Sequence, residues 1–435
     1  MLDRYLNHNL FKAGLKQFYS TDPHLAALSQ LKYQHKADWW KPLDKMTPGI
    51  YILTGGRQIG KSTSCKLLIK HCLQKRLLLP QRILYLPCDE IFDAKELGEV
   101  LRFFLKEITN EPFLLIIDEI TFVKDWDRVI KALADEGFFK QGVCLLTGSD
   151  TLILKDAAMR FPGRRGAAEQ TDFHLYPLSF AEYVKLRSPK KIPENQGLYV
   201  LFQDYLICGG YLRAINELAQ TGKVGNATFA TYEQWIRGDV LKRGKNENTL
   251  MGILHALLTV GVSQISYSGL TQKVGLVSKE TLIDYCRLLE RMGLLINLQA
   301  FDQNKKQGFP RKDRKFHFTD PFIHRTLSNW LQREGYLNSK PSEHTIVEAS
   351  VASHCHRLAK TYYFKGQGEV DIIWLPNDIV QAVEIKWSQE IRPSDLKTLK
   401  HFKNRLILSK SPQGGIINET KTLPVYQWLC DQEPG

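Results

Sequence analysis

Residues 54–63 read Thr-Gly-Gly-Arg-Gln-Ile-Gly-Lys-Ser-Thr, and from Gly55 to Ser62 they match the spacing G-x-x-x-x-G-K-[ST]. An apolar run, residues 50–53, comes directly before this stretch, and a helical pattern over residues 64–74 follows it. The sequence therefore predicts a strand, a glycine-rich loop and a helix, which is the setting that a phosphate-binding loop needs.

This loop predicts a site for ATP and Mg²⁺. Its glycines let successive backbone N–H groups converge on an anion, and the helix N-terminus adds its dipole. We expect Lys61 to reach the β- and γ-phosphates and Ser62 to hold Mg²⁺. The predicted nucleotide-contacting residues of the loop are Gly55, Gly56, Arg57, Gln58, Ile59, Gly60, Lys61, Ser62 and Thr63. The alternative is a glycine-rich turn that fits by chance, but the flanking strand and helix argue against it.

A second motif supports the first. Residues 113–117 form an unbroken apolar run, and Asp118 and Glu119 follow it. Continuous apolar runs are typical of buried parallel strands, and open α/β sheets bind ligands at the carboxyl ends of their strands. We therefore expect Asp118 to contribute to the nucleotide and Mg²⁺ site, and Glu119 to act as the base that aligns the attacking water. Two solvated acids at a strand end are the alternative.

Composition bounds the class of protein. The chain has 435 residues, of which 43% are hydrophobic, enough for roughly two to four domains. Its net charge is +13, and residues 226–336 hold 16 Lys and Arg against 10 Asp and Glu, so a polyanion partner is expected. The eight cysteines include no C-x-x-C pair, and neither a signal-peptide core nor a membrane-length apolar run occurs. These features predict a reduced, cytoplasmic protein that does not enter a membrane.

The order of patterns predicts an α/β fold with a parallel P-loop sheet. Residues 49–190 alternate between strand and helix, with strands expected at 49–53, 82–87, 113–117, 143–147 and 172–175, and helices at 61–73, 94–108 and 127–136. Residues 1–48 are interpreted as an extension that carries one short amphipathic helix (Leu6, Leu10, Phe11 and Leu15) and no chemistry. Residues 191–245 are helical in pattern and are interpreted as a lid.

Two further features could complete the nucleotide site. Residues 147–150 end the strand beside the Asp-Glu strand, where P-loop ATPases place a polar residue that senses the γ-phosphate. Ser149 is the first candidate and Thr147 the second, with an ordinary strand-end turn as the alternative.

Arg164 and Arg165 lie in a Gly/Pro loop downstream. A guanidinium fits phosphate geometry and can act from a neighbouring subunit, although a solvated basic loop is the alternative.

Five stretches in this order carry a family resemblance. They are Gly-Gly-Arg-Gln-Ile-Gly-Lys-Ser-Thr from residue 55, Ile-Ile-Asp-Glu-Ile from 116, Leu-Thr-Gly-Ser from 146, Pro-Gly-Arg-Arg-Gly from 162 and His-Leu-Tyr-Pro-Leu-Ser-Phe-Ala-Glu-Tyr from 174. The chain resembles the AAA+-type prokaryotic ATPases in which a P-loop domain precedes a winged helix and a nuclease-like domain. The resemblance covers most of residues 20–435. It implies ATP binding, arginine fingers and hence a homo-oligomer.

Residues 246–335 read as a winged helix. Helices are expected at 249–260, 267–274 and 278–292, followed by strands at 294–301 and 314–318. The intervening hairpin carries Lys305, Lys306, Arg311 and Lys312, continued by Arg314 and Lys315. A helix-turn-helix with a basic hairpin suits DNA, and the hairpin is expected to contact phosphate rather than bases. A winged helix that binds proteins is the alternative.

Residues 336–435 hold a second chemical constellation. Glu384 and Lys386 alternate on one predicted strand and so share a face, and Asp371 lies on the adjacent one. Two carboxylates with a lysine can hold Mg²⁺ and a water above a phosphodiester. With Glu348 from a helix, the set resembles the PD-(D/E)xK nuclease core, so Glu348, Asp371 and Glu384 are the expected metal ligands, and Asp371, Glu384 and Lys386 the expected catalytic residues. A degraded fold that keeps its strands is the alternative. Residues 354–356, His-Cys-His, are interpreted as solvated helix surface.

Together these observations predict the fold in order: an N-terminal extension (1–48), the P-loop ATPase domain (49–190), a helical lid (191–245), a winged helix (246–335) and a small α/β nuclease-like domain (336–435). The leading hypothesis is an ATP-regulated DNA-binding and DNA-processing enzyme. The alternative is an ATP-dependent switch or protein-remodelling ATPase whose nuclease-like domain only binds.

Overall fold

The computed structural model describes residues 2–108, 111–149, 153–154, 161, 163–276, 278–388, 391 and 396–432. Asp150 and Pro162, which belong to two of the predicted motifs, lie outside these residues. The chain divides into two compact units, Met1–Tyr176 and Pro177–Gly435. In the described part of the chain, no helix combines the length and the apolar character needed to span a membrane.

The first unit is built on a five-stranded sheet whose order is β2-β3-β4-β1-β5 and whose neighbouring strands all run parallel. The strands are β1 (Gly49–Gly55), β2 (Ile83–Pro87), β3 (Leu114–Asp118), β4 (Val143–Gly148) and β5 (Asp172–Leu175). The first four are buried along their whole length, and apart from polar residues near their carboxyl ends they are largely apolar, as is typical of buried parallel strands. The predicted parallel α/β sheet is confirmed, and the carboxyl ends of β1, β3 and β4 meet at one edge.

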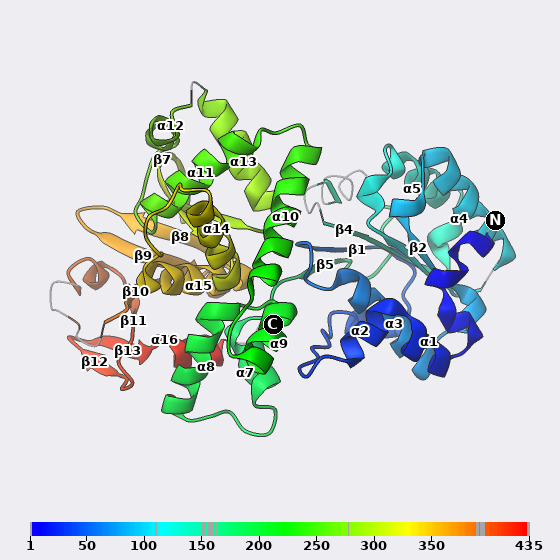
Figure 1. Cartoon of the computed structure of the whole chain (residues 1–435), viewed down its shortest axis with the longest axis horizontal. Coiled ribbons are helices and arrows are strands. Elements are labelled where there is room, and N and C mark those ends of the chain that lie inside the picture. Colours follow the sequence, from blue (N-terminus) through cyan, green and yellow to red (C-terminus); the bar gives the residue numbers. More distant parts are fainter. Residues whose placement is uncertain are drawn as a thin grey trace. The chain divides into compact units, whose positions relative to one another are not determined.

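Helices cover both faces of this sheet (Figure 1). On one face lie α4 (Ala94–Glu107) and α5 (Trp126–Asp135), and on the other lie α1 (Leu15–Thr21), α2 (Pro23–Ser29) and α3 (Lys61–Gln74). Short 3₁₀ turns complete the unit: η1 (Leu2–His8), η2 (Leu10–Ala13), η3 (Lys41–Lys45), η4 (Pro80–Arg82), η5 (Cys88–Glu90), η6 (Ile120–Phe122) and η7 (Phe138–Lys140).

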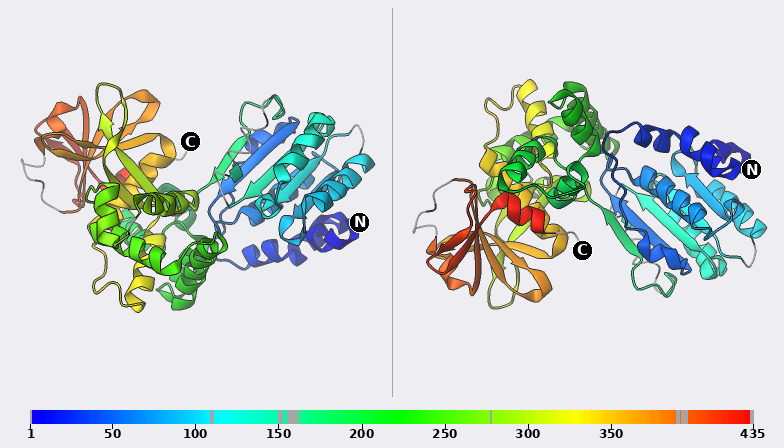
Figure 2. Two further views of the ribbon diagram at one scale, coloured as in Figure 1. Left: turned by 90° about the horizontal axis from the view of Figure 1, so that it is seen from above. Right: turned by 90° about the horizontal axis from the view of Figure 1, so that it is seen from below.

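The N-terminal extension differs from the expectation of one amphipathic helix. Residues 2–8 and 10–13 form two 3₁₀ turns, and Leu6 is 50% exposed while Phe11 is fully buried. Figure 2 shows this extension running along the sheet. The side-chain amide of Asn9 donates to the carbonyl of Tyr85 and accepts from its N–H, both at 2.9 Å. Since β2 is an edge strand, Asn9 satisfies backbone groups that no neighbouring strand reaches.

The second unit begins with helices α7 (Phe180–Arg187), α8 (Asn195–Cys208), α9 (Leu212–Thr221) and α10 (Asn226–Lys242), of which the last three correspond to the predicted lid. Two glycines, Gly209 and Gly210, follow α8. The side chain of Asp320, the N-cap of α14 (Pro321–Arg333), lies against both of them. Gly209 has φ +54°, and a Cβ there would lie 1.8 Å from Oδ1 of Asp320. The same carboxylate accepts from Gly210 N at 2.9 Å and from Phe322 N at 2.8 Å. A side chain at residue 209 therefore has no room.

Three helices and a hairpin follow, close to the predicted bounds: α11 (Glu247–Val260), α12 (Tyr267–Val274), α13 (Lys279–Arg291), β6 (Leu295–Asp302) and β7 (Gln307–Phe318). Asn246, Ser266 and Ser278 cap the three helices with side-chain oxygens that accept backbone N–H groups. Strand β7 is exposed near the hairpin tip and buried from Lys315 onward. The expectation that Lys315 continues the solvated basic hairpin is therefore wrong.

An eight-stranded sheet, ordered β12-β13-β11-β10-β9-β8-β6-β7, continues this hairpin into the C-terminal region. Its further elements are α15 (Glu343–Leu358), β8 (Lys360–Lys365), β9 (Glu369–Leu375), η8 (Pro376–Asp378), β10 (Gln381–Lys386), η10 (Leu399–His401), β11 (Asn404–Ser409), β12 (Gly415–Ile417), β13 (Thr420–Pro424) and α16 (Val425–Asp431). Strands β6 and β7 lie before residue 335, the predicted end of the winged helix, and the other strands of the same sheet lie after it. The domain boundaries within this unit stay predictions.

Residues 354–356 on α15 were expected to be solvated, but of the two histidines only His356 is exposed. His354 is 3% exposed and Cys355 fully buried. Nε2 of His354 accepts from Phe180 N at 2.8 Å, and Nδ1 lies 2.8 Å from the carbonyl of Ser350. Burial lowers the pKa of His354 to about 3, so the ring is neutral and links α15 to the N-terminus of α7.

Candidate functional site

The loop between β1 and α3 has the backbone that its sequence predicts. Gly55 has φ +149°, and a Cβ there would lie 2.5 Å from the carbonyl oxygen of Leu175. Gln58 and Gly60 also have positive φ, at +61° and +93°. The ammonium of Lys61 donates to the carbonyls of Gly55 and Gly56, each at 3.1 Å. The loop therefore curls around the lysine that begins α3.

Glu119 lies opposite this lysine. Its carboxylate is 3.3 Å from the Lys61 ammonium and accepts a hydrogen bond from Ser149 N at 3.0 Å. Glu119 has φ +52°, a left-handed conformation that is uncommon for a residue with a side chain and often marks functional positions. The structure thus brings together three predicted site residues that are far apart in the sequence.

Asp118 is held from two strands. The Thr147 hydroxyl at the end of β4 donates to Oδ1 of Asp118 and accepts from the backbone N–H of Glu119 at 3.0 Å. The Tyr85 hydroxyl on β2 donates to Oδ2. Asp118 is 4% exposed and Thr147 fully buried. Of the two sensor candidates, Thr147 orients the acidic pair, while Ser149 touches Glu119 through its backbone. The sensing role of either residue stays a prediction.

Sequence reasoning missed Tyr85. Burial and the negative charge of Asp118 raise the pKa of the Tyr85 hydroxyl well above the usual value. Behind the ring, the buried ammonium of Lys66 lies 3.7 Å from the ring centroid and 3.2 Å from Asp22 of the N-terminal extension. The available signal was a hydroxyl inside the otherwise apolar strand 83–87.

This arrangement fits a nucleotide with Mg²⁺. The loop backbone at Gly55 has a turn that favours glycine, and Ser62 and Asp118 supply oxygen ligands, the type that Mg²⁺ prefers. Bound Mg²⁺ would offset the charge of the phosphates. Lys61 would bind phosphate oxygens, and Glu119 would hold the attacking water and accept its proton.

The two loop arginines are ion-paired within the first unit. Arg164 pairs with Asp135. Arg165 contacts both carboxylate oxygens of Asp172 at 2.7 and 3.0 Å and the carbonyl of Thr171 at 3.1 Å. A role of either guanidinium in a neighbouring copy's site stays a prediction, and it requires exchange of these partners for a phosphate.

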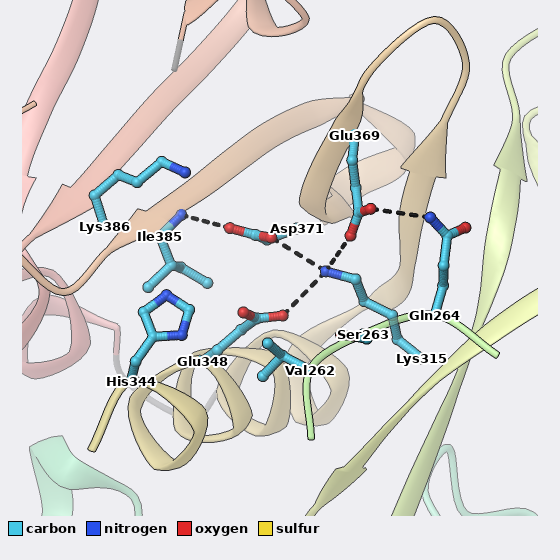
Figure 3. A pocket seen from close by; sticks show the side chains of 10 residues that line it. All are labelled: Val262, Ser263, Gln264, Lys315, His344, Glu348, Glu369, Asp371, Ile385 and Lys386. Carbon is cyan, nitrogen blue, oxygen red and sulfur yellow. Dashed lines mark hydrogen bonds and ion pairs between the residues drawn. The ribbon is translucent and has the colours of Figure 1, made fainter. Parts of the chain in front are cut away.

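A second cluster lies in the C-terminal unit. Figure 3 shows the Lys315 ammonium between three carboxylates: Glu369 at 2.7 Å, Glu348 at 3.1 Å and Asp371 at 3.1 Å. We call these four residues the Lys315 cluster. Lys315 is 1% exposed. Burial alone lowers its pKa, but the three carboxylates outweigh burial and raise it above the usual value. The cluster borders a cavity of about 300 Å³.

Of the predicted nuclease residues, Glu348 and Asp371 belong to this cluster, and Glu384 and Lys386 come from the neighbouring strand β10. Asp371 Oδ2 accepts from Ile385 N at 2.9 Å, and Glu384 pairs with Lys386 at 2.8 Å. Burial and the charge of Asp371 raise the pKa of Glu384 to about 7, and they raise that of Glu348 well above its usual range. Within the described residues, Oε2 of Glu348 and Oε2 of Glu384 are buried without a hydrogen-bond partner.

This set of acids fits Mg²⁺ poorly. An ammonium already lies between Glu348, Glu369 and Asp371, and Glu384 has its own lysine. Among the described residues, no group of three or more His, Cys, Asp or Glu side chains is arranged to hold a metal ion. The metal-binding and catalytic roles predicted for Glu348, Asp371, Glu384 and Lys386 stay predictions, although the structure does bring these four residues to one region.

The hairpin β6–β7 presents positive charge to solvent. Lys305, Lys306, Arg311 and Lys312 are all exposed. Arg314 is fixed instead: its guanidinium carbon lies 4.9 Å from the centroid of the Tyr267 ring on α12, and it donates to Asn297 Oδ1 at 3.3 Å. The exposed cations thus extend from a base that is anchored to the helices.

Three parts of the chain match known protein-family models. Residues 47–184 match an AAA domain, residues 200–334 a domain of unknown function (DUF8612), and residues 343–428 a further domain of unknown function (DUF4143). An uncharacterized protein of Haemophilus influenzae is 23% identical over 404 residues, 88% of this chain and 95% of its own. An uncharacterized protein of Methanocaldococcus jannaschii is 25% identical over 300 residues, 62% of this chain and 60% of its own.

Solved structures are similar at a low level. A Walker-type ATPase of Pyrococcus abyssi has a TM-score of 0.45 and 15% identity and covers 67% of this chain and 95% of its own. The Orc1 protein of Aeropyrum pernix in complex with DNA has a TM-score of 0.35 and 11% identity, with 72% and 92% covered. These scores are too low to support an argument. With the AAA-domain match, the parallel sheet and the loop geometry, residues 47–184 form an AAA-type ATPase domain.

Proposed function

We propose that this protein is a Mg²⁺-dependent ATPase that couples nucleotide hydrolysis to the binding of nucleic acid, with DNA as the expected partner. The observation that carries the ATPase part is the contact of Glu119 with Lys61 at 3.3 Å, next to Asp118. It supports the assignment because Lys61, the proposed phosphate-binding lysine, and Glu119, the proposed base, lie together at the sheet edge where Asp118 ends β3. The left-handed backbone of Glu119 adds support, because such conformations are found more often at functional sites.

The nucleic-acid part rests on the hairpin β6–β7. Its exposed cations, Lys305, Lys306, Arg311 and Lys312, project from a base fixed by Arg314 and Tyr267. Positive side chains on a protruding hairpin contact phosphates and give affinity without reading sequence. We further propose a homo-oligomer in which Arg164 or Arg165 reaches the γ-phosphate held by a neighbouring copy.

One experiment tests both parts. The steady-state ATPase rate is measured without nucleic acid and with single-stranded DNA, double-stranded DNA or RNA. The proposal expects hydrolysis that needs Mg²⁺ and rises with DNA. Hydrolysis that DNA leaves unchanged, in a protein that does not bind DNA, would reject the nucleic-acid part and leave the ATPase part standing.

The Lys315 cluster favours a second candidate: an ATP-dependent switch or remodelling ATPase whose C-terminal region binds a partner and does not cut. Its carboxylates already have a cation. The nuclease hypothesis expects cleavage of some DNA form in Mg²⁺ or Mn²⁺ that Asp371→Ala and Lys386→Ala remove while ATPase activity stays. The switch expects nucleotide-dependent complex formation without cleavage.

A further inference from the structure

The Lys315 cluster joins segments that are distant in the sequence. Lys315 comes from strand β7, Glu348 from helix α15, and Glu369 and Asp371 from strand β9. The lysine and Glu348 are each 1% exposed, whereas Asp371 and Glu369 are 15% and 32% exposed on the side of the cavity. The ammonium is therefore at the inner end of the cavity, where Figure 3 places it among the carboxylates.

Three carboxylates surround the Lys315 ammonium. It donates hydrogen bonds to Glu348 Oε1 and Asp371 Oδ1, both at 3.1 Å, and forms an ion pair with Glu369 at 2.7 Å. Buried charges are stable only when they are paired and hydrogen-bonded, so the acids and the lysine depend on one another. The remaining nearby acid, Glu384, has Lys386 at 2.8 Å. Each of the four acids thus has a lysine partner.

We propose that the ammonium of Lys315 takes the place of a divalent cation in this cluster, so that β7, α15 and β9 are joined without metal. A divalent ion between Glu348 and Asp371 would have to displace Lys315 or lie against its positive charge. Both alternatives oppose metal binding. Among the described residues near the cluster, Oε2 of Glu348 and Oε2 of Glu384 are buried without a hydrogen-bond partner, so the test removes the charge of Glu384 together with that of Asp371. This inference does not depend on the proposed ATPase activity.

The first test uses the full-length protein without nucleotide. Mn²⁺ binding is measured from the electron paramagnetic resonance signal of free Mn²⁺, for the wild type and for the double variant Asp371→Asn/Glu384→Gln. We expect the two binding curves to coincide. A Mn²⁺ site, one per chain, that is present in the wild type and lost in the double variant would overturn the proposal.

The second test removes the lysine. Lys315→Ala should gain one Mn²⁺ site per chain, at least ten-fold tighter than any binding by the wild type, and Mn²⁺ should raise its Tm. Adding Asp371→Asn should abolish both effects. Lys312→Ala, an exposed lysine on the same strand, should gain nothing. A folded Lys315→Ala that binds no Mn²⁺ overturns the proposal. If this variant does not fold, the first test, which compares the wild type with Asp371→Asn/Glu384→Gln, decides the question.

Discussion

Tyr85 in the middle of β2 and Asp118 at the end of the neighbouring strand β3 are joined by a hydrogen bond, with the tyrosine hydroxyl as donor. The backbone of Tyr85 is held by Asn9, and its ring is covered by the Lys66 ammonium. The N-terminal extension therefore supports the acid that is expected to serve the Mg²⁺ site, although its sequence shows no chemistry of its own.

Tyr85→Phe should lower kcat about ten-fold and raise the Mg²⁺ concentration needed for half-maximal activity, because a hydrogen bond to a charged group contributes about 1.5–3 kcal/mol. ATP binding without Mg²⁺ should be unchanged. Tyr51→Phe is the matched control, since Tyr51 lies on β1, which does not neighbour β3, and its hydroxyl donates to the carbonyl of Thr47. An equal loss in both variants, with no change in Mg²⁺ dependence, would show that Tyr85 only stabilises the fold.

Replacing Lys305, Lys306, Arg311 and Lys312 together by Ala should weaken DNA binding uniformly across sequences. Every cation that no longer neutralises a phosphate should flatten the slope of log K against log salt by about 0.9 for duplex DNA. A charge-matched variant of four exposed lysines in the first unit (Lys36, Lys41, Lys95 and Lys131) is the control. Equal slopes for the wild type and the hairpin variant would mean that the hairpin does not touch DNA.

Arg164→Ala and Arg165→Ala should bind ATP but hydrolyse it slowly, because a finger contributes to the transition state of a neighbouring site. Mixing either variant with Lys61→Ala should restore part of the rate. Asp135→Asn and Asp172→Asn break the same ion pairs and keep the arginines, so they serve as controls. If the aspartate variants lose as much activity as the arginine variants, the arginines have only a structural role.

Asp320 should make the stability of the second unit depend on pH. Burial raises the pKa of its carboxyl to about 6, against backbone hydrogen bonds that lower it. Because the folded-state pKa lies above the ordinary value near 3.8, the stabilising contribution is complete below about pH 4 and is lost as pH rises through about 6.

Relative to Asp320→Asn, the wild type should therefore lose up to about 3 kcal/mol of unfolding free energy between pH 4 and pH 7. The difference in Tm between the two proteins, followed across this range, measures the effect. A difference that stays constant with pH would show that the carboxyl is ionised throughout.

The sequence predicted those elements that are determined by residues close together in the chain. The glycine spacing of residues 55–62 and the apolar run before Asp118 were enough for the sheet, the loop and the acidic pair. The start of the predicted helix at 278–292 is equally local, since the Ser278 side-chain oxygen accepts from an N–H three residues later. The predicted bounds of these elements differ from the structure by a few residues at most.

What the sequence could not show depends on partners distant in the chain. In the sequence, Lys315 looks like one more cation of a basic hairpin. It is a buried counter-ion because carboxylates on α15 and β9 pack against its ammonium. His354 reads as solvated, yet Phe180, 174 residues away, covers it. Tyr85 is one hydroxyl in an apolar strand until Asn9 and Asp118 are brought beside it. Composition and periodicity carry no information on such pairs.

The central claim is that Glu119 acts on a nucleotide bound by Lys61, and the most direct test is single-turnover hydrolysis of bound ATP by Glu119→Gln. Glutamine keeps the size of the side chain but cannot accept the proton of the attacking water. The account predicts ATP affinity within a few-fold of the wild type, and hydrolysis slower by at least about 100-fold. Glu99→Gln, on exposed α4 surface, should hydrolyse normally. Hydrolysis by Glu119→Gln at the wild-type rate would contradict the account.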